Sequence, residues 1–243
     1  MMTERGAGVE TRRQPTRRSH RPPGDEHRPV ITVTSATELV YQELRQRIIR
    51  GLQPGSPLRL NDLAAQLGVS VTPIRGALER LVADGLAARE HRKGTTVALL
   101  SLDEFLDIYA IREGIEGVAA GLGAAELNDG DLAEMKRLFD YMDTGTPDLD
   151  TYLVTHWQMH DVCFEASARR RLVEEIRSYR RQAERYLRLA LADPSEIRRD
   201  MEHQRAFLAA CERRDAVSAS ALIRSMLKWT VVRVVPRLGE LGK

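Results

Sequence analysis

Three histidines are the residues of this chain whose type and spacing best suit metal chemistry. His156 and His160 are four positions apart, so on a helix they lie one turn apart on the same face and could share a metal ion. His203 lies in a later helical stretch and offers a third possible ligand. A histidine pair with this spacing also arises by coincidence on surfaces and in cores. The spacing alone therefore leaves a metal site and a coincidence both open.

Arg112 is the second residue of chemical interest. It shares a helical face with Phe105, Ile108 and Tyr109, which predicts that its side chain points into a core. A buried guanidinium needs an anionic partner. Glu116, one helical turn further along, would form an internal ion pair with it. The alternative partner is the anionic group of a bound ligand.

The elements that would position these residues are helices. From Ser101 onward the sequence shows helical periodicity without a strand pattern, and Ser101 with Glu104 forms a possible capping box. Turn-forming or helix-breaking residues recur between the helical stretches, near 128–130, 145–147, 168–170, 193–194 and 214–215. Residues 101–239 are therefore predicted to form an all-α bundle of about six helices.

Residues 58–98 follow a different pattern, which is typical of a winged helix-turn-helix. Two short apolar-periodic helices flank a turn at Gly68, with Asn61 and Ser70 as their expected N-caps. A basic run that ends at Gly94 lies between two short β-prone stretches. This run is predicted to form a small β-hairpin wing.

The second helix of this pattern is the one predicted to read DNA. Its apolar residues form a stripe that should be buried, which leaves Thr72 and Arg75 on the outer face, where they can bond phosphates or base edges. A further helix over about 36–50 completes a domain that spans residues 34–100. A winged helix-turn-helix places one such helix in the DNA major groove.

Length and charge frame these two domains. The chain has 243 residues and a net charge of +2, so its basicity is local, as suits a DNA-binding head on a balanced body. Cys163 and Cys211 are too few for a disulfide scaffold. There is no membrane-span or signal-peptide pattern, and we expect a cytoplasmic protein without a membrane partner. Residues 1–33 are rich in Arg and Pro and are expected to form a disordered basic arm.

The head resembles the DNA-binding domain of the GntR family of bacterial transcription regulators. The matching residues are Pro54, Gly55, Leu58, Leu63, Ala64, Leu67, Gly68, Val69, Ser70, Thr72, Pro73, Ile74, Arg75, Ala77, Leu78, Leu81, Gly85, Leu86 and Gly94. Val71 stands where the family usually has Arg, Gly76 where it has Glu, and Asn61 where many members place a DNA-contacting Arg. The operator of a relative therefore does not carry over to this chain. The residues implied to contact DNA are Arg59, Asn61, Ser70, Val71, Thr72, Pro73, Arg75, Arg92, Lys93 and Gly94.

The second half is similar to the ligand-binding domain of the FadR-type branch of this family, the FCD domain. The matching residues are Tyr109, Arg112, Glu116, Ala119, Ala120, His160, Glu165, Ala166, Ser167, Leu172, Glu202, His203, Asp215 and Ala219. The branch binds a divalent metal through one Asp and three His, although some members hold none. His160 and His203 match two ligand positions, His156 stands at the Asp position, and Met226, a poor ligand, stands at the last. The resemblance implies a zinc, nickel or manganese site of His156, His160 and His203.

The two resemblances together imply a ligand-responsive, homodimeric transcription regulator. We expect a repressor that a small organic-acid effector releases from a double-stranded DNA operator, with Arg112 binding the effector's carboxylate. The alternative function is a metal-dependent enzyme that carries a DNA-binding head. Against it, the sequence shows no general base beside the histidines, no nucleophile elbow and no phosphate-cradling glycine loop.

Overall fold

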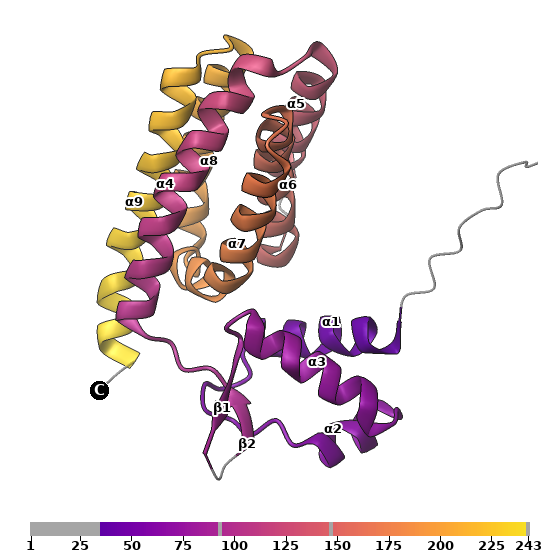
Figure 1. The fold of residues 1–243 in the computed structure, drawn as a ribbon. Helices are drawn as coiled ribbons and strands as arrows, with labels where there is room; N and C mark the ends of the chain where they lie inside the picture. The colour runs from indigo at the N-terminus through magenta and orange to yellow at the C-terminus, as the bar shows by residue number, and fades with distance from the viewer. Residues whose placement is uncertain (1–34, 92–93, 146–147, 242–243) are drawn as a thin grey trace, which may run out of the picture. The chain divides into compact units, whose positions relative to one another are not determined.

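The structure is a computed structural model that describes residues 35–91, 94–145 and 148–241. Contacts divide the chain into residues 1–34 and a unit from Ser35 onward, and only the latter is described. The predicted arm, 1–33, lies outside the described residues, as do Arg92 and Lys93 at the predicted wing tip. The described part consists of three helices, a two-stranded hairpin and six further helices (Figure 1). This confirms the predicted fold class.

The head contains the helices α1 (Ala36–Ile49), α2 (Leu60–Leu67) and α3 (Val71–Ala83). The turn between α2 and α3 needs Gly68, whose φ of 65° is a left-handed conformation that residues with a Cβ rarely adopt. Asn61 was expected to cap α2, but the helix already begins at Leu60 after an extended Arg59. Asn61 therefore lies within the first turn and cannot act as the cap.

Two short strands form the wing. β1 (Ala87–Glu90) and β2 (Gly94–Val97) pair antiparallel, with Ala87 opposite Val97. Gly94 opens β2 with a φ of 81°, again a conformation that favours glycine. The hairpin packs onto the head through Val97, which is buried in the same apolar cluster as Leu44 of α1 and Leu81 of α3.

Gly76, one of the departures from the family pattern, has a packing role. A Cβ added to Gly76 would lie 3.0 Å from the side-chain methyl of Thr37. This is tighter than almost all real Cβ contacts, so α3 approaches α1 at a distance that suits glycine. The head thus differs from the usual sequence at a helix–helix contact as well as at its expected DNA contacts.

The bundle consists of six helices that run to the end of the described chain. They are α4 (Leu102–Glu126), α5 (Asp129–Thr144), α6 (Leu149–Ala166), α7 (Arg170–Ala190), α8 (Pro194–Glu212) and α9 (Ala216–Leu241). Each predicted break overlaps the gap between two of these helices. At the break before α8, Asp193 accepts a hydrogen bond from the Ser195 amide at 2.7 Å, and Pro194 occupies the first turn. No helix of the described part is long and apolar enough to span a membrane.

One apolar core holds the bundle together. Its largest fully buried side chains include Phe105, Tyr152, Phe164, Tyr186 and Phe207. The two longest helices, α4 and α9, share the most extensive helix–helix contact. A set of polar and charged side chains lies buried within this otherwise apolar core. Such groups are costly unless paired, so they are the natural place to look for a ligand site.

Candidate functional site

The outer face of α3 carries the residues that can contact DNA. Ile74 and Leu78 are buried against the head, which turns Thr72 and Arg75 to solvent. Thr72 lies in the first turn of α3, where backbone amides without helical acceptors also favour an anion such as phosphate. The chemistry of this face fits contact with a nucleic-acid backbone and with base edges.

The remaining described residues that were predicted to contact DNA lie at the start of α2, at the start of α3 and in the wing. Those described and exposed are Arg59, Asn61, Ser70, Thr72, Arg75 and Gly94, and those half-buried are Val71 and Pro73. A pocket of about 430 Å³ between α3 and the wing is lined by residues that include Arg75, Glu79 and Arg89. The Arg89 guanidinium lies 3.4 Å from the Glu79 carboxylate. Arg89 lines this pocket but was not among the residues predicted to contact DNA, although it belongs to the basic run of the predicted wing.

In the bundle, Arg112 forms a buried ion pair with Glu116. Its Nε donates to Glu116 Oε1 at 2.6 Å, and Arg180 Nη2 donates to the other carboxylate oxygen at 3.0 Å. Arg180 Nη1 continues the chain of charges to Asp161 at 2.9 Å. Burial raises the pKa of Glu116, but the guanidiniums of Arg112 and Arg180 outweigh it and leave this pKa lowered. The internal ion pair expected from the sequence is therefore present.

Arg112 and Tyr109 also have unused donors. Arg112 Nη1 and Tyr109 Oη are buried, and neither forms a hydrogen bond of good geometry among the described residues, although the two side chains are close enough for each to shift the pKa of the other. Both residues line a cavity of about 20 Å³, roughly the space of one water molecule, together with Glu116, His156, His160 and Asp200. An unsatisfied buried donor costs about 1–3 kcal/mol, so an acceptor placed here would be bound favourably.

The two predicted histidines of α6 face a matching pair on α8. His156 Nδ1 lies 3.1 Å from Asp200 Oδ2, and His160 Nε2 lies 2.7 Å from Gln204 Oε1. Tyr152 donates from its hydroxyl to the same Asp200 oxygen. Burial lowers the pKa of His160 well below its usual range, and the nearby His156 and Arg180 lower it further. His160 is therefore neutral at physiological pH.

His203, the third predicted ligand, does not join this cluster. Its ring packs edge-on against Trp229 with centroids 5.5 Å apart, and its buried Nδ1 has no hydrogen-bond partner among the described residues. Met226 does reach the cluster, with its sulfur 3.7 Å from Gln204 Nε2. In the part of the chain that the structure describes, no three or more His, Cys, Asp or Glu side chains are placed to hold a metal ion. The donor set therefore does not fit the metal site that the resemblance implied.

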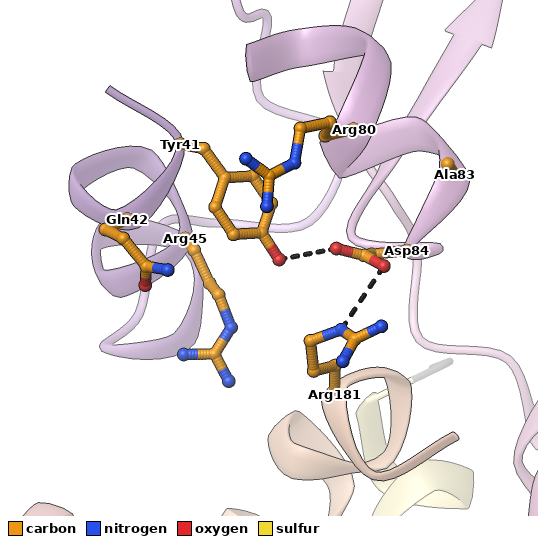
Figure 2. A pocket seen from close by; sticks show the side chains of 7 residues that line it. All are labelled: Tyr41, Gln42, Arg45, Arg80, Ala83, Asp84 and Arg181. Carbon is orange, nitrogen blue, oxygen red and sulfur yellow. Dashed lines mark hydrogen bonds and ion pairs between the residues drawn. The ribbon is translucent and has the colours of Figure 1, made fainter. Parts of the chain in front are cut away.

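A second polar pocket, of about 440 Å³, is lined by Tyr41, Gln42, Arg45, Arg80, Ala83, Asp84 and Arg181 (Figure 2). Asp84 accepts from the Tyr41 hydroxyl and, at 3.4 Å, from Arg181 Nε. Burial and the Asp84 carboxylate raise the pKa of Tyr41 to about 12. Each arginine of the lining has a carboxylate partner, in the pairs Arg45–Glu184, Arg80–Glu38 and Arg181–Asp84. Its charges are balanced internally, and the polar core of the bundle is the better ligand site.

Comparison with known families decides between the two functions considered above. Residues 36–97 match the family described as bacterial regulatory proteins, gntR family, and residues 107–228 match the FCD domain. The chain belongs to the GntR family. Its head is therefore a DNA-binding domain, and its bundle is a domain for a small-molecule effector. This GntR-family regulator is not the metal-dependent enzyme considered as the alternative.

Individual proteins and solved structures are also similar to this chain. The transcriptional repressor GlaR of Escherichia coli is 28% identical over 208 residues, which cover 81% of this chain and 94% of GlaR. The structure of E. coli McbR/YncC has a TM-score of 0.71 at 25% identity and covers 84% of this chain and 98% of its own. A putative GntR regulator from Rhodococcus shares the fold, with a TM-score of 0.68 at 22% identity, covering 82% and 97% of the two chains.

Proposed function

We propose that this regulator is a repressor that a small carboxylate releases from its operator, and that the carboxylate binds at Arg112. The observation that carries the proposal is the pair of unsatisfied donors, Arg112 Nη1 and Tyr109 Oη, at one buried cavity. A carboxylate has two acceptor oxygens and prefers charged or hydroxyl donors. Arg112 can keep Glu116 on its Nε and offer Nη1 to the ligand. The ion-pair and clamp interpretations of Arg112 are therefore compatible.

The small size of the cavity explains how the proposed effector could change the conformation of the bundle. Space for about one water molecule cannot admit an organic acid, so binding requires the surrounding helices to move apart. Leu187 of α7 and Leu227 of α9 line the cavity and would have to shift. A ligand moves an equilibrium between two conformations only by its differential affinity for them. An effector that binds only the expanded bundle has this differential affinity, because it does not bind the compact conformation at all.

The same proposal includes a homodimer that acts in the cytoplasm on a two-fold operator. Ile111, Val118 and Leu122 of α4 leave 40%, 47% and 41% of their surface exposed. Their spacing places them on one side of the helix, away from the residues that pack in the core. A contiguous exposed apolar face supports contact with another protein surface. Paired heads would then match two half-sites in DNA.

The test compares Arg112→Met with a matched loss of guanidinium at the surface, Arg170→Met, whose side chain is 92% exposed. DNA that the full chain selects from random duplexes is titrated at one stated salt concentration, with and without each of a panel of mono- and dicarboxylic acids. We expect one acid to weaken DNA binding by the parent and by Arg170→Met by about 5- to 150-fold. Arg112→Met should bind the same DNA without responding.

Three outcomes would contradict this proposal. A normal response by Arg112→Met excludes the clamp, and the absence of any responsive acid excludes the carboxylate class. If Arg112→Met fails to fold, Tyr109→Phe removes only the unpartnered hydroxyl, and an unaltered effector response in that variant also excludes the site. Sedimentation of Val118→Glu tests the dimer. A glutamate at this position would be buried in the proposed interface, so the variant should sediment as a monomer.

A further inference from the structure

The side-chain amide of Gln204 contacts three side chains of the types that ligate metals. Its Oε1 is 2.7 Å from His160 Nε2, and its Nε2 is 3.2 Å from His156 Nδ1 and 3.4 Å from Asp200 Oδ2. Two imidazoles and a carboxylate are donors that zinc, nickel and manganese accept. Among the described residues these groups do not surround a shared ion position, and the Gln204 amide contacts each of them instead.

Hydrogen bonding also commits both nitrogens of His160. Arg180 Nη2 lies 3.3 Å from Nδ1 and can only donate, so Nδ1 is the acceptor. Nε2 must then carry the hydrogen of the neutral ring and donate it to Gln204 Oε1. A ligating nitrogen needs a free lone pair. His160 Nε2, the nitrogen that faces Gln204, has no free lone pair in this arrangement.

Met226 of α9 also contacts the Gln204 amide. Its sulfur accepts from Gln204 Nε2 at 3.7 Å. A thioether is a soft, neutral donor and does not suit manganese, which prefers oxygen ligands. Gln204 thus satisfies its neighbours through hydrogen bonds that cross from α8 to α6 and α9, and it needs no ion to do so.

We propose that Gln204 makes this site independent of metal, and that Gln204→His converts it into a divalent-metal site with His156, His160 and Asp200. Replacing the amide removes the acceptor that holds the hydrogen on His160 Nε2. Arg180 keeps Glu116 and Asp161 as acceptors, so its long contact with His160 can open. The inference rests on the proposed function only in assigning the effector to the same polar core.

The test measures binding of zinc, nickel and cobalt to the full chain, purified without an affinity tag and stripped with a chelator. The matched control is Gln158→His, which adds a histidine on the exposed side of α6. Gln204→His should bind one equivalent of metal at least about tenfold more tightly than the parent or Gln158→His. Its cobalt complex should show visible absorption bands, and adding His156→Ala to it should abolish both.

Several results would overturn the proposal. One is that the parent binds one equivalent of metal and loses it in His156→Ala. Gln204 would then not prevent metal binding at this site. Another is a Gln204→His protein that binds no more tightly than Gln158→His. If Gln204→His does not fold, Gln204→Ala is used instead, because it also removes the side-chain amide. Gln204→Ala should bind more metal than Gln158→Ala, and equal binding by the two variants counts against the proposal. Effector response is measured separately with chelator present, and its absence would count against the proposed function alone.

Discussion

Gly123 of α4 lies directly against the backbone of Cys163 on α6. A Cβ built on Gly123 would be 1.8 Å from the Cys163 carbonyl oxygen and 2.8 Å from its carbonyl carbon. The obstacle is main chain, which cannot rotate away as a flexible side chain would. Glycine at this position therefore sets the separation of two helices that carry Arg112 and the histidine pair.

This contact predicts opposite effects for two glycines of the same helix. Gly123→Ala should destabilise the bundle by about 1–3 kcal/mol or more, because the added methyl forces α4 and α6 apart. A Cβ on Gly114 meets nothing within 4 Å, so Gly114→Ala should instead stabilise the chain by about 0.5–1 kcal/mol through helix propensity. Urea unfolding of the three proteins measures both. A Gly123→Ala protein as stable as the parent would show that α4 and α6 lie further apart than this contact requires.

His160 predicts how stability depends on pH. In the unfolded chain it protonates near its ordinary pKa of about 6.5, whereas burial keeps it neutral in the folded chain until a much lower pH. The unfolded state therefore binds more protons below pH 6.5, and the free energy of unfolding should fall by about 1.4 kcal/mol per pH unit from this group. The loss amounts to about 2 kcal/mol between pH 7.5 and pH 5. His160→Gln should remove this slope, and urea titrations at several pH values in that range would show it.

A second decline in the free energy of unfolding comes from buried carboxylates, and it occurs at lower pH than the decline from His160. The folded-state pKa of Glu116 and of Asp200 is lowered, because nearby cationic and hydrogen-bonding groups outweigh the effect of burial. Their stabilisation is present above their ordinary values and is lost as the pH falls through the lowered ones. This decline should persist in His160→Gln. A parent and a His160→Gln variant with the same slope above pH 5 would mean that His160 is protonated in the folded chain.

Local patterns in the sequence were enough to predict the helices of the bundle and where they end. The break at Asp193 and Pro194 shows why, since a capping side chain and a missing amide act within one turn. Asn61, by contrast, does not take the capping position predicted for it. A good capping residue is only a candidate, and the extended backbone of Arg59 lets the helix begin earlier at Leu60.

The polar core shows the limit of such patterns. Adjacent helical residues point about 100° apart, so only one of His203 and Gln204 can face α6, and Gln204 is the one that does. Its spacing from Asp200 equals that of the histidine pair and was the available signal. Arg180 was missed for a different reason. Its helix is rich in arginine, and Glu116, which selects the buried one, lies 64 residues away in the chain.

Arg75 provides the test of the predicted DNA face. It is exposed on α3 beside the wing, where it can make a charge-assisted contact with a base or a phosphate. Arg75→Ala should weaken binding to selected DNA about tenfold or more, a loss of about 1.4 kcal/mol or more that lies within the about 1–3 kcal/mol of a contact that reads a base. Arg199→Ala removes the same charge from an exposed position on α8 and should leave the affinity unchanged. Equal affinities for the two variants in a gel-shift titration would remove Arg75 from the interface.

Val71 tests what the departure from the family pattern does. It is the first residue of α3 and half-buried, so an arginine there can extend toward a phosphate. Val71→Arg should tighten binding to DNA of any sequence and steepen the dependence of log affinity on log salt by about 0.9 for each phosphate contacted. A cation at a helix N-terminus should also cost about 0.3–1 kcal/mol of head stability. Val71→Gln adds a polar side chain without charge and should leave the salt dependence unaltered. If Val71→Arg and Val71→Gln bind alike at every salt concentration, the start of α3 does not approach the DNA backbone, and the recognition surface must lie further along the helix, toward Arg75.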